Sequence, residues 1–141
     1  MRKFFFILIL LSTIATSILH AQAPDLTKIT GNKEKIKALL DYCSVLRLNK
    51  NSDPTNYIKL QKAGLSGLQL VKTNDPEDRA SFSEYVALGY YYQIRFDSAQ
   101  YFFYQSLHSA QRAKSTTLIA GASEALMSVN FQLQQPDKVE E

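Results

Sequence analysis

Five segments, each several helical turns long and separated from the next by a short polar break, constrain the fold of this chain more than any other feature. In each segment, apolar side chains recur every three or four residues, which is the spacing of one face of an α-helix. No segment alternates like a β-strand, and no Asn-Gly or Asp-Gly hairpin turn occurs. Helices of this length joined by short turns pack as antiparallel neighbours, so the sequence predicts an all-α fold, an α-α superhelix of helix pairs. The predicted helices cover residues 33–48, 54–71, 76–93, 97–113 and 116–133, and a sixth opens at Pro136.

Two of the breaks end in an Asp-Pro pair, Asp53-Pro54 and Asp75-Pro76. An Asp side chain can accept a hydrogen bond from an unpaired N–H of the first helical turn, and proline at the first helical position has no N–H to lose. The two acidic residues after Pro76 place negative charge at the positive end of the helix that follows. Both pairs therefore predict helix starts.

Residues 1–21 have the order of a secretory signal peptide: a basic start with Arg2 and Lys3, an apolar run over residues 4–19, and small residues around Ala21. We expect cleavage after Ala21, because cleavage two residues later would place a rigid proline in the protease cleft. An uncleaved anchor is the alternative, although residues 4–19 are fewer than the ~20 needed to cross a bilayer. The leader predicts export to the periplasm of a bacterium, or beyond it.

The mature chain of about 120 residues is long enough for one compact domain. We expect residues 22–32 to be an N-terminal linker and residues 33–141 to form the helical repeat domain, with its last repeat incomplete. Loss of Arg2 and Lys3 lowers the Lys and Arg count from 16 to 14, against 13 Asp and Glu, so the mature formal charge is +1. No clustered basic face appears, so we expect no nucleic-acid partner.

Cys43 is the only cysteine, so no disulfide can form within the chain and packing must stabilise it. It lies in phase with Ile36, Leu39, Leu40 and Leu46, which predicts a buried thiol that acts as a small hydrophobe. An intermolecular disulfide is the alternative.

The helical segments also repeat at a regular spacing. Phe96-Asp97 opens one predicted helix, Pro136-Asp137 opens a later one, and a helix that opens at Tyr57 precedes the first of these by nearly the same interval. A helix pair that recurs at such a fixed period is typical of a solenoid, in which each unit packs on the next.

Residues 85–107 carry the clearest copy of the repeat. The first helix of this run holds a Leu-Gly pair and then a tyrosine, and the second holds a small residue, an aromatic residue four positions later and another small residue three positions after that. These residues are Leu88, Gly89, Tyr92, Ala99, Phe103 and Ser106. The pattern resembles the tetratricopeptide repeat family, in which small residues let helix backbones approach and large ones fill the neighbouring gaps.

The run also departs from that family. The turn between Gly89 and Ala99 is about two residues short and lacks the usual glycine. An ungapped alignment would place Val86 and Ala87 in the Leu-Gly positions. The sequence leaves both alignments open. The resemblance extends weakly from Asp53 to the end of the chain.

The resemblance implies a function as well as a fold. The spacing between equivalent helices is longer than the standard repeat of the family, and it is similar to that of a subclass found in exported N-terminal sensing segments of bacterial two-component sensor kinases. We therefore expect a protein or peptide partner held in a concave groove. The chain would be either the sensing part of a longer sensor, tethered to the inner membrane by a part beyond Glu141, or a free-standing periplasmic adaptor. In the ungapped alignment, the residues facing the groove are Glu84, Leu88, Tyr91, Tyr92, Glu124, Ser128 and Phe131.

No residue pattern points to catalysis, a cofactor or a metal. His108 is the only histidine outside the leader and lies mid-helix without a cysteine nearby, so we expect it on a solvated helix face. Residues 49–60 imitate the oxygens of a calcium loop. However, Pro54 replaces the required glycine and Leu60 the bidentate glutamate. An enzyme or small-ligand binder is the alternative, which a closed pocket with a charged side chain would favour.

The predicted helix over residues 116–133 carries the apolar residues Leu126, Val129 and Leu133. End units of a stack need a polar outer face. We therefore expect these three residues to form an uncovered apolar face that drives homodimerisation or lowers solubility.

Overall fold

The computed structural model describes residues 22–49, 53–72 and 75–134. A short 3-10 turn, η1 (Leu26–Lys28), precedes five helices: α2 (Asn32–Leu48), α3 (Thr55–Leu70), α4 (Pro76–Tyr92), α5 (Phe96–Ala113) and α6 (Thr116–Leu133). These described ranges contain no strand, and the predicted all-α superhelix of antiparallel helix pairs is confirmed. The predicted signal peptide and the helix expected from Pro136 lie outside the described residues.

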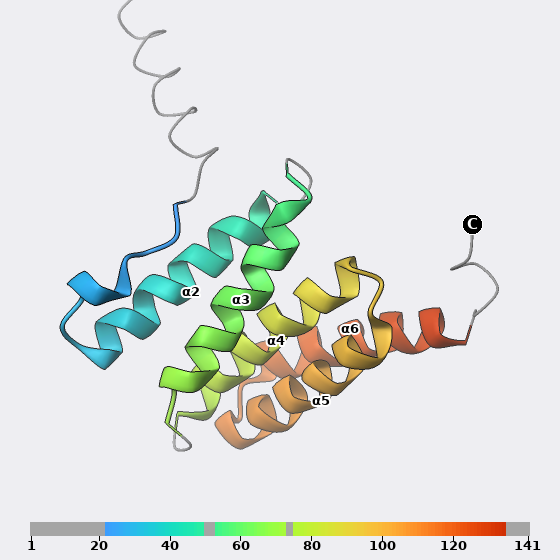
Figure 1. Cartoon of the computed structure of the whole chain (residues 1–141). Helices are drawn as coiled ribbons and strands as arrows, with labels where there is room; N and C mark the ends of the chain where they lie inside the picture. Colours follow the sequence, from blue (N-terminus) through green and yellow to red (C-terminus); the bar gives the residue numbers. More distant parts are fainter. Residues whose placement is uncertain (1–21, 50–52, 73–74, 135–141) are drawn as a thin grey trace, which may run out of the picture.

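The helices stack in chain order (Figure 1). Each helix packs chiefly against its neighbours in the sequence, with α2 at one end of the stack and α6 at the other. Helix α4 also touches α2 on one side and α6 on the other, whereas contact between α3 and α5 is marginal at most. We call α2, α4 and α6 the inner layer.

Each Asp-Pro pair marks a helix start, but each confirms only part of the prediction. Pro54 lies just before Thr55, the first residue of α3, although Asp53 does cap that helix. The Asp53 carboxylate accepts hydrogen bonds from the Thr55 N–H at 2.8 Å and the Thr55 hydroxyl at 2.7 Å. These bonds, the hydroxyl first, lower the pKa of Asp53 to about 2. Pro76 is the first residue of α4, as predicted, but the Asp75 side chain makes no capping bond, so that part of the prediction is wrong.

Two helices end in left-handed residues that are not glycine. At the end of α4, Ile94 has φ 60°, and the Arg95 N–H donates to the Tyr90 carbonyl. At the end of α5, Lys114 has φ 55°. The backbone bonds are those of a Schellman motif, whose left-handed position usually holds glycine. A β-branched residue there is strained, so the α4–α5 turn keeps its shape despite an unfavourable residue.

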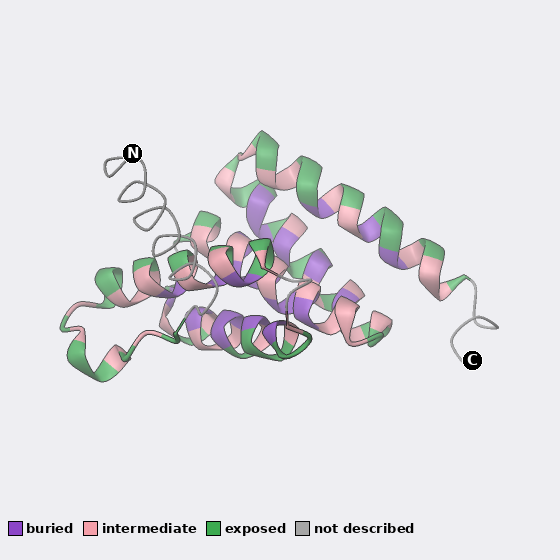
Figure 2. Ribbon diagram, turned by 90° about the horizontal axis from the view of Figure 1, so that it is seen from above, coloured by how far each residue is buried: buried purple, intermediate pink, exposed green. Residues whose placement is uncertain are grey.

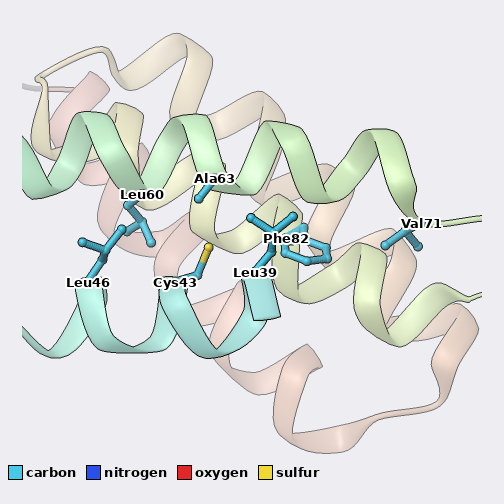
Figure 3. Close-up of a cluster of buried hydrophobic side chains, with 7 residues drawn as sticks. All are labelled: Leu39, Cys43, Leu46, Leu60, Ala63, Val71 and Phe82. Atoms are coloured by element: carbon cyan, nitrogen blue, oxygen red, sulfur yellow. The ribbon is translucent and has the colours of Figure 1, made fainter. Parts of the chain in front are cut away.

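The first core cluster joins α2, α3 and α4 (Figure 3). Cys43 is fully buried in it, as predicted, and desolvation raises the pKa of its thiol to about 12. Leu26 of η1 packs against the edge of this cluster, so part of the segment expected as a linker contributes to the packed domain. The buried members of the cluster are Leu39, Cys43, Leu46, Leu60, Ala63, Val71 and Phe82.

The second core cluster joins α4, α5 and α6, and it overturns the prediction of an uncovered apolar face. Leu126 and Val129 are buried in this cluster and Leu133 packs against it. The apolar stripe of α6 packs against α4 and α5, so Leu126 and Val129 do not lie on an uncovered face. The outward side of α6 is exposed instead and carries Met127 and Phe131 (Figure 2).

Close approach of α3 and α4 depends on glycine. A Cβ atom at Gly67 would lie 2.3 Å from the ring of Phe82, and one at Gly89 would lie 2.6 Å from the Cβ of Gln61. Gly64 also lies against α4, where a Cβ atom would lie 2.7 Å from the Val86 side chain. The small residues therefore set the distance between these two helices.

Contacts between α4 and α5 use a different set of small residues. Ala87 and Ala99 are both fully buried in the second cluster, and the Ser106 hydroxyl donates to the Ala80 carbonyl at 2.9 Å. Gly89 thus lies on the side of α4 that packs against α3, and Ala87 lies on the side that packs against α5. No helix within the described ranges is long and apolar enough to span a membrane.

Candidate functional site

A pocket of about 220 Å³ opens between α4 and α6 of the inner layer. It draws residues from three helices, because α5 lies behind the two inner helices and closes the space between them. We call this space the α4–α6 pocket. Its lining residues are Leu88, Tyr91, Tyr92, Phe103, Ala125 and Ser128.

A chain of aromatic rings holds the tyrosine wall of the pocket in place. Tyr92 stacks on Tyr57 of α3 with ring centroids 4.4 Å apart. Tyr91 meets Tyr92 edge-on at 5.4 Å and Phe96 edge-on at 5.5 Å. Such pairs add about 0.5–1.5 kcal/mol each beyond their buried area, so the wall is preorganised.

The structure brings four of the seven predicted groove residues together in this pocket: Leu88, Tyr91, Tyr92 and Ser128. The other three lie outside its lining. Glu84 is turned toward α2, while Glu124 and Phe131 lie on the exposed side of α6. Glu124 nevertheless lies one helical turn before the lining residue Ser128, whose hydroxyl donates to the Glu124 carbonyl.

Polar contacts bridge the corresponding space between α2 and α4. Arg47 of α2 forms an ion pair with Glu84 at 3.0 Å, and the Glu84 side chain is only 14% exposed. One position along, the hydroxyls of Ser44 and Tyr85 are hydrogen-bonded at 3.0 Å. The two spaces of the inner layer therefore differ, because one is bridged by side chains of the chain itself and the other is a pocket.

Two lining residues, Phe103 and Ala125, were missing from the predicted face. Phe103 is 1% exposed, and its spacing in the sequence marks it only as core. A pocket floor and a core position give the same apolar periodicity, so no signal in the sequence separates them. Ala125 lies next to the predicted residue Glu124 in the sequence. Its place in the lining depends on how α6 is rotated about its own axis relative to α4, which the sequence does not specify.

The lining of the pocket is uncharged, and most of it is apolar or aromatic. Its lining contains no histidine, cysteine or carboxylate, and Ser128 donates its hydroxyl to the Glu124 carbonyl at 3.2 Å. His108 is exposed on α5, as predicted. Among the described residues, no group of three or more His, Cys, Asp or Glu side chains could hold a metal ion.

Comparison of the chain with protein-family models, with curated proteins and with solved structures gives no match. The fold and the α4–α6 pocket therefore stand on this structure alone.

Proposed function

We propose that this chain is a non-catalytic helical repeat module that holds a protein or peptide partner in the α4–α6 pocket. The observation that carries the proposal is the convergence of four residues, chosen from the sequence as a groove face, on one pocket with a preorganised aromatic wall. Rigid aromatic side chains dominate the energetics of protein interfaces, which supports this use of the surface.

The size of the pocket supports a polypeptide ligand over a small molecule. At about 220 Å³ it is smaller than the roughly 300–1,000 Å³ typical of small-molecule sites. It suits a single side chain of a partner whose backbone runs along the inner layer. Tyr91 and Tyr92 are the only titratable residues of the lining, so the pocket brings together no His or carboxylate of the kind most often used in general acid–base chemistry, and this supports a non-catalytic role.

The packing of α4 is relevant to the proposed membership in the tetratricopeptide repeat family. Ala87, rather than Gly89, is the small residue that packs with Ala99 of α5. This arrangement supports the ungapped alignment, in which Ala87 takes the glycine position of the repeat. The groove residues named from the sequence were chosen in that alignment.

A selection experiment tests the proposed function. The protein, purified from the periplasm of an expressing bacterium, is used to select binders from a random dodecapeptide library displayed on phage. We expect peptides whose binding is lost in Ser128→Trp, which fills the pocket from an exposed position, and retained in the matched control Met127→Trp. Circular dichroism checks that both variants keep their helices. Peptides that bind Ser128→Trp as well as the parent protein would refute the proposal.

Export and cellular context are parts of the same proposal. We propose a mature N-terminus at Gln22, which the mass of the periplasmic protein measures directly. An unprocessed mass would contradict cleavage after Ala21. The sensing segment of a two-component sensor kinase is the preferred context, resting on the long repeat spacing. A membrane span and kinase domain encoded beyond Glu141 would support it, whereas a stop codon there would support a free-standing adaptor.

A further inference from the structure

We infer that the α4–α6 pocket selects a basic side chain, arginine or lysine, of its polypeptide partner, and that Glu124 is the residue that recognises its charge. This inference rests on the proposed function and names the chemistry of the partner. The inference rests on a comparison of two spaces in the inner layer. Side chains of α2 and α4 bridge the space between those two helices, whereas the space between α4 and α6 is a pocket.

The space between α2 and α4 is the reference. There, Glu84 of α4 receives the guanidinium of Arg47 from the preceding inner helix at 3.0 Å. The carboxylate is largely covered, with its side chain 14% exposed, while the arginine is 51% exposed. The glutamate of α4 is thus paired with a cationic side chain of α2, the inner helix that precedes it in the chain.

Glu124 occupies the same place on α6 that Glu84 occupies on α4. The two helices can be aligned without a gap so that each buried residue of α6 corresponds to a buried residue of α4. In this alignment the buried residues Phe82, Val86 and Gly89 of α4 correspond to the buried residues Ala122, Leu126 and Val129 of α6. The same alignment pairs Glu84 with Glu124. The repeat therefore places a second carboxylate at the edge of the second space.

The chain provides no cation for this second carboxylate. Across the described residues, the Glu124 side chain has no ion pair and no hydrogen bond, and it is exposed. The side of α4 that faces it contributes Leu88 and Tyr91 to the pocket, neither of which is charged. Glu124 is also the only charged residue of α6. A single carboxylate therefore stands beside an otherwise uncharged pocket.

A basic side chain matches both the apolar lining of the pocket and the carboxylate of Glu124. Its methylene stem can lie against Leu88 while its charged end reaches Glu124. The ring faces of Tyr91 and Tyr92 also attract a cation, and arginine, with a planar guanidinium, can stack on them as well. An acidic or neutral polar side chain would gain none of these contacts, so the geometry favours a basic residue next to apolar ones.

The experiment uses the peptides selected on the parent protein. We expect them to be enriched in arginine or lysine flanked by apolar residues. Resynthesis with citrulline in place of arginine, or norleucine in place of lysine, removes the charge and keeps most of the shape. We expect this to weaken binding by about two- to fivefold, as for an exposed ion pair. Raising the salt from about 0.05 M to about 0.5 M should weaken the charged peptide more than its neutral analogue.

Glu124→Gln should lower affinity for the charged peptide by a similar factor and leave the neutral analogue unaffected. Glu34→Gln is the matched control, since it removes an exposed carboxylate at the far end of the stack. Selected peptides that need the pocket but show no preference for a cation, or bind Glu124→Gln equally well, would overturn this inference and leave the proposed function intact. Failure to select any pocket-dependent peptide would overturn both.

Discussion

Substitution of Gly89 by alanine tests whether α3 and α4 are as close as the structure has them. The new Cβ would lie 2.6 Å from the Cβ of Gln61, 3.0 Å from its Cα and 2.9 Å from the carbonyl oxygen of Tyr57. Two of these three atoms belong to the backbone of α3, so they cannot rotate away as the end of a flexible side chain could. The two helices must therefore separate or shift to accept the methyl group.

The expected magnitude combines two opposing effects. Alanine is favoured over glycine in a helix interior by about 1 kcal/mol. Overpacking a close contact costs about 1–3 kcal/mol, and a contact with backbone falls in the upper part of that range. We therefore expect Gly89→Ala to lower the free energy of unfolding by about 1–2 kcal/mol, measured by urea denaturation with an unchanged m-value.

Gly121→Ala is the matched control for this prediction. Gly121 is also inside a helix, α6, but no atom lies within 4 Å of its would-be Cβ. Only the helix-propensity effect remains there, so we expect the free energy of unfolding to rise by about 0.5–1 kcal/mol. If the two substitutions change stability in the same direction and by similar amounts, the close packing of α3 on α4 is refuted.

Three further substitutions or measurements address other parts of the stack. Ala99→Leu should overpack the fully buried α4–α5 contact and lower the free energy of unfolding by about 1–3 kcal/mol; an unchanged thermal midpoint would argue against that helix pair. Ile94→Gly should raise stability by about 1 kcal/mol in urea titrations, because glycine relieves the left-handed strain at φ 60°, and a loss of stability would contradict this interpretation of the turn. The Cys43 thiol should resist a chromogenic thiol reagent at about pH 8 until the protein unfolds. Prompt labelling of the folded protein would disprove the burial. Burial raises the pKa of Cys43 from 9.0 to about 12, so the unfolded chain loses the thiol proton at a lower pH than the folded protein does. The free energy of unfolding should therefore fall as the pH rises between these two values.

Much of the fold was predictable from local signals. Each helix ends within about two residues of its predicted bounds, because polar breaks and proline positions act locally on the backbone. The burial of Cys43 followed from its phase with neighbouring leucines. Four residues of the pocket followed from a single choice of alignment along α4 and α6.

The features that could not be predicted depend on which neighbour covers a helix. The stripe containing Leu126 and Val129 is periodic whether it faces α5 or solvent, so periodicity alone led to the wrong face. The roles of Gly64 and Gly67 depend on the close approach of α4, which no local pattern in the sequence indicates. The Arg47–Glu84 ion pair joins residues far apart in the sequence and has no local signature.

The most direct test of the binding surface is a nuclear magnetic resonance titration with a spin-labelled version of the selected peptide. We expect broadening of amide signals to concentrate on the inner layer around Leu88, Tyr91 and Ser128, with little effect on the outward sides of α3 and α5. Broadening centred on α3 and α5, or on α2 at the far end of the stack, would contradict the proposed binding surface.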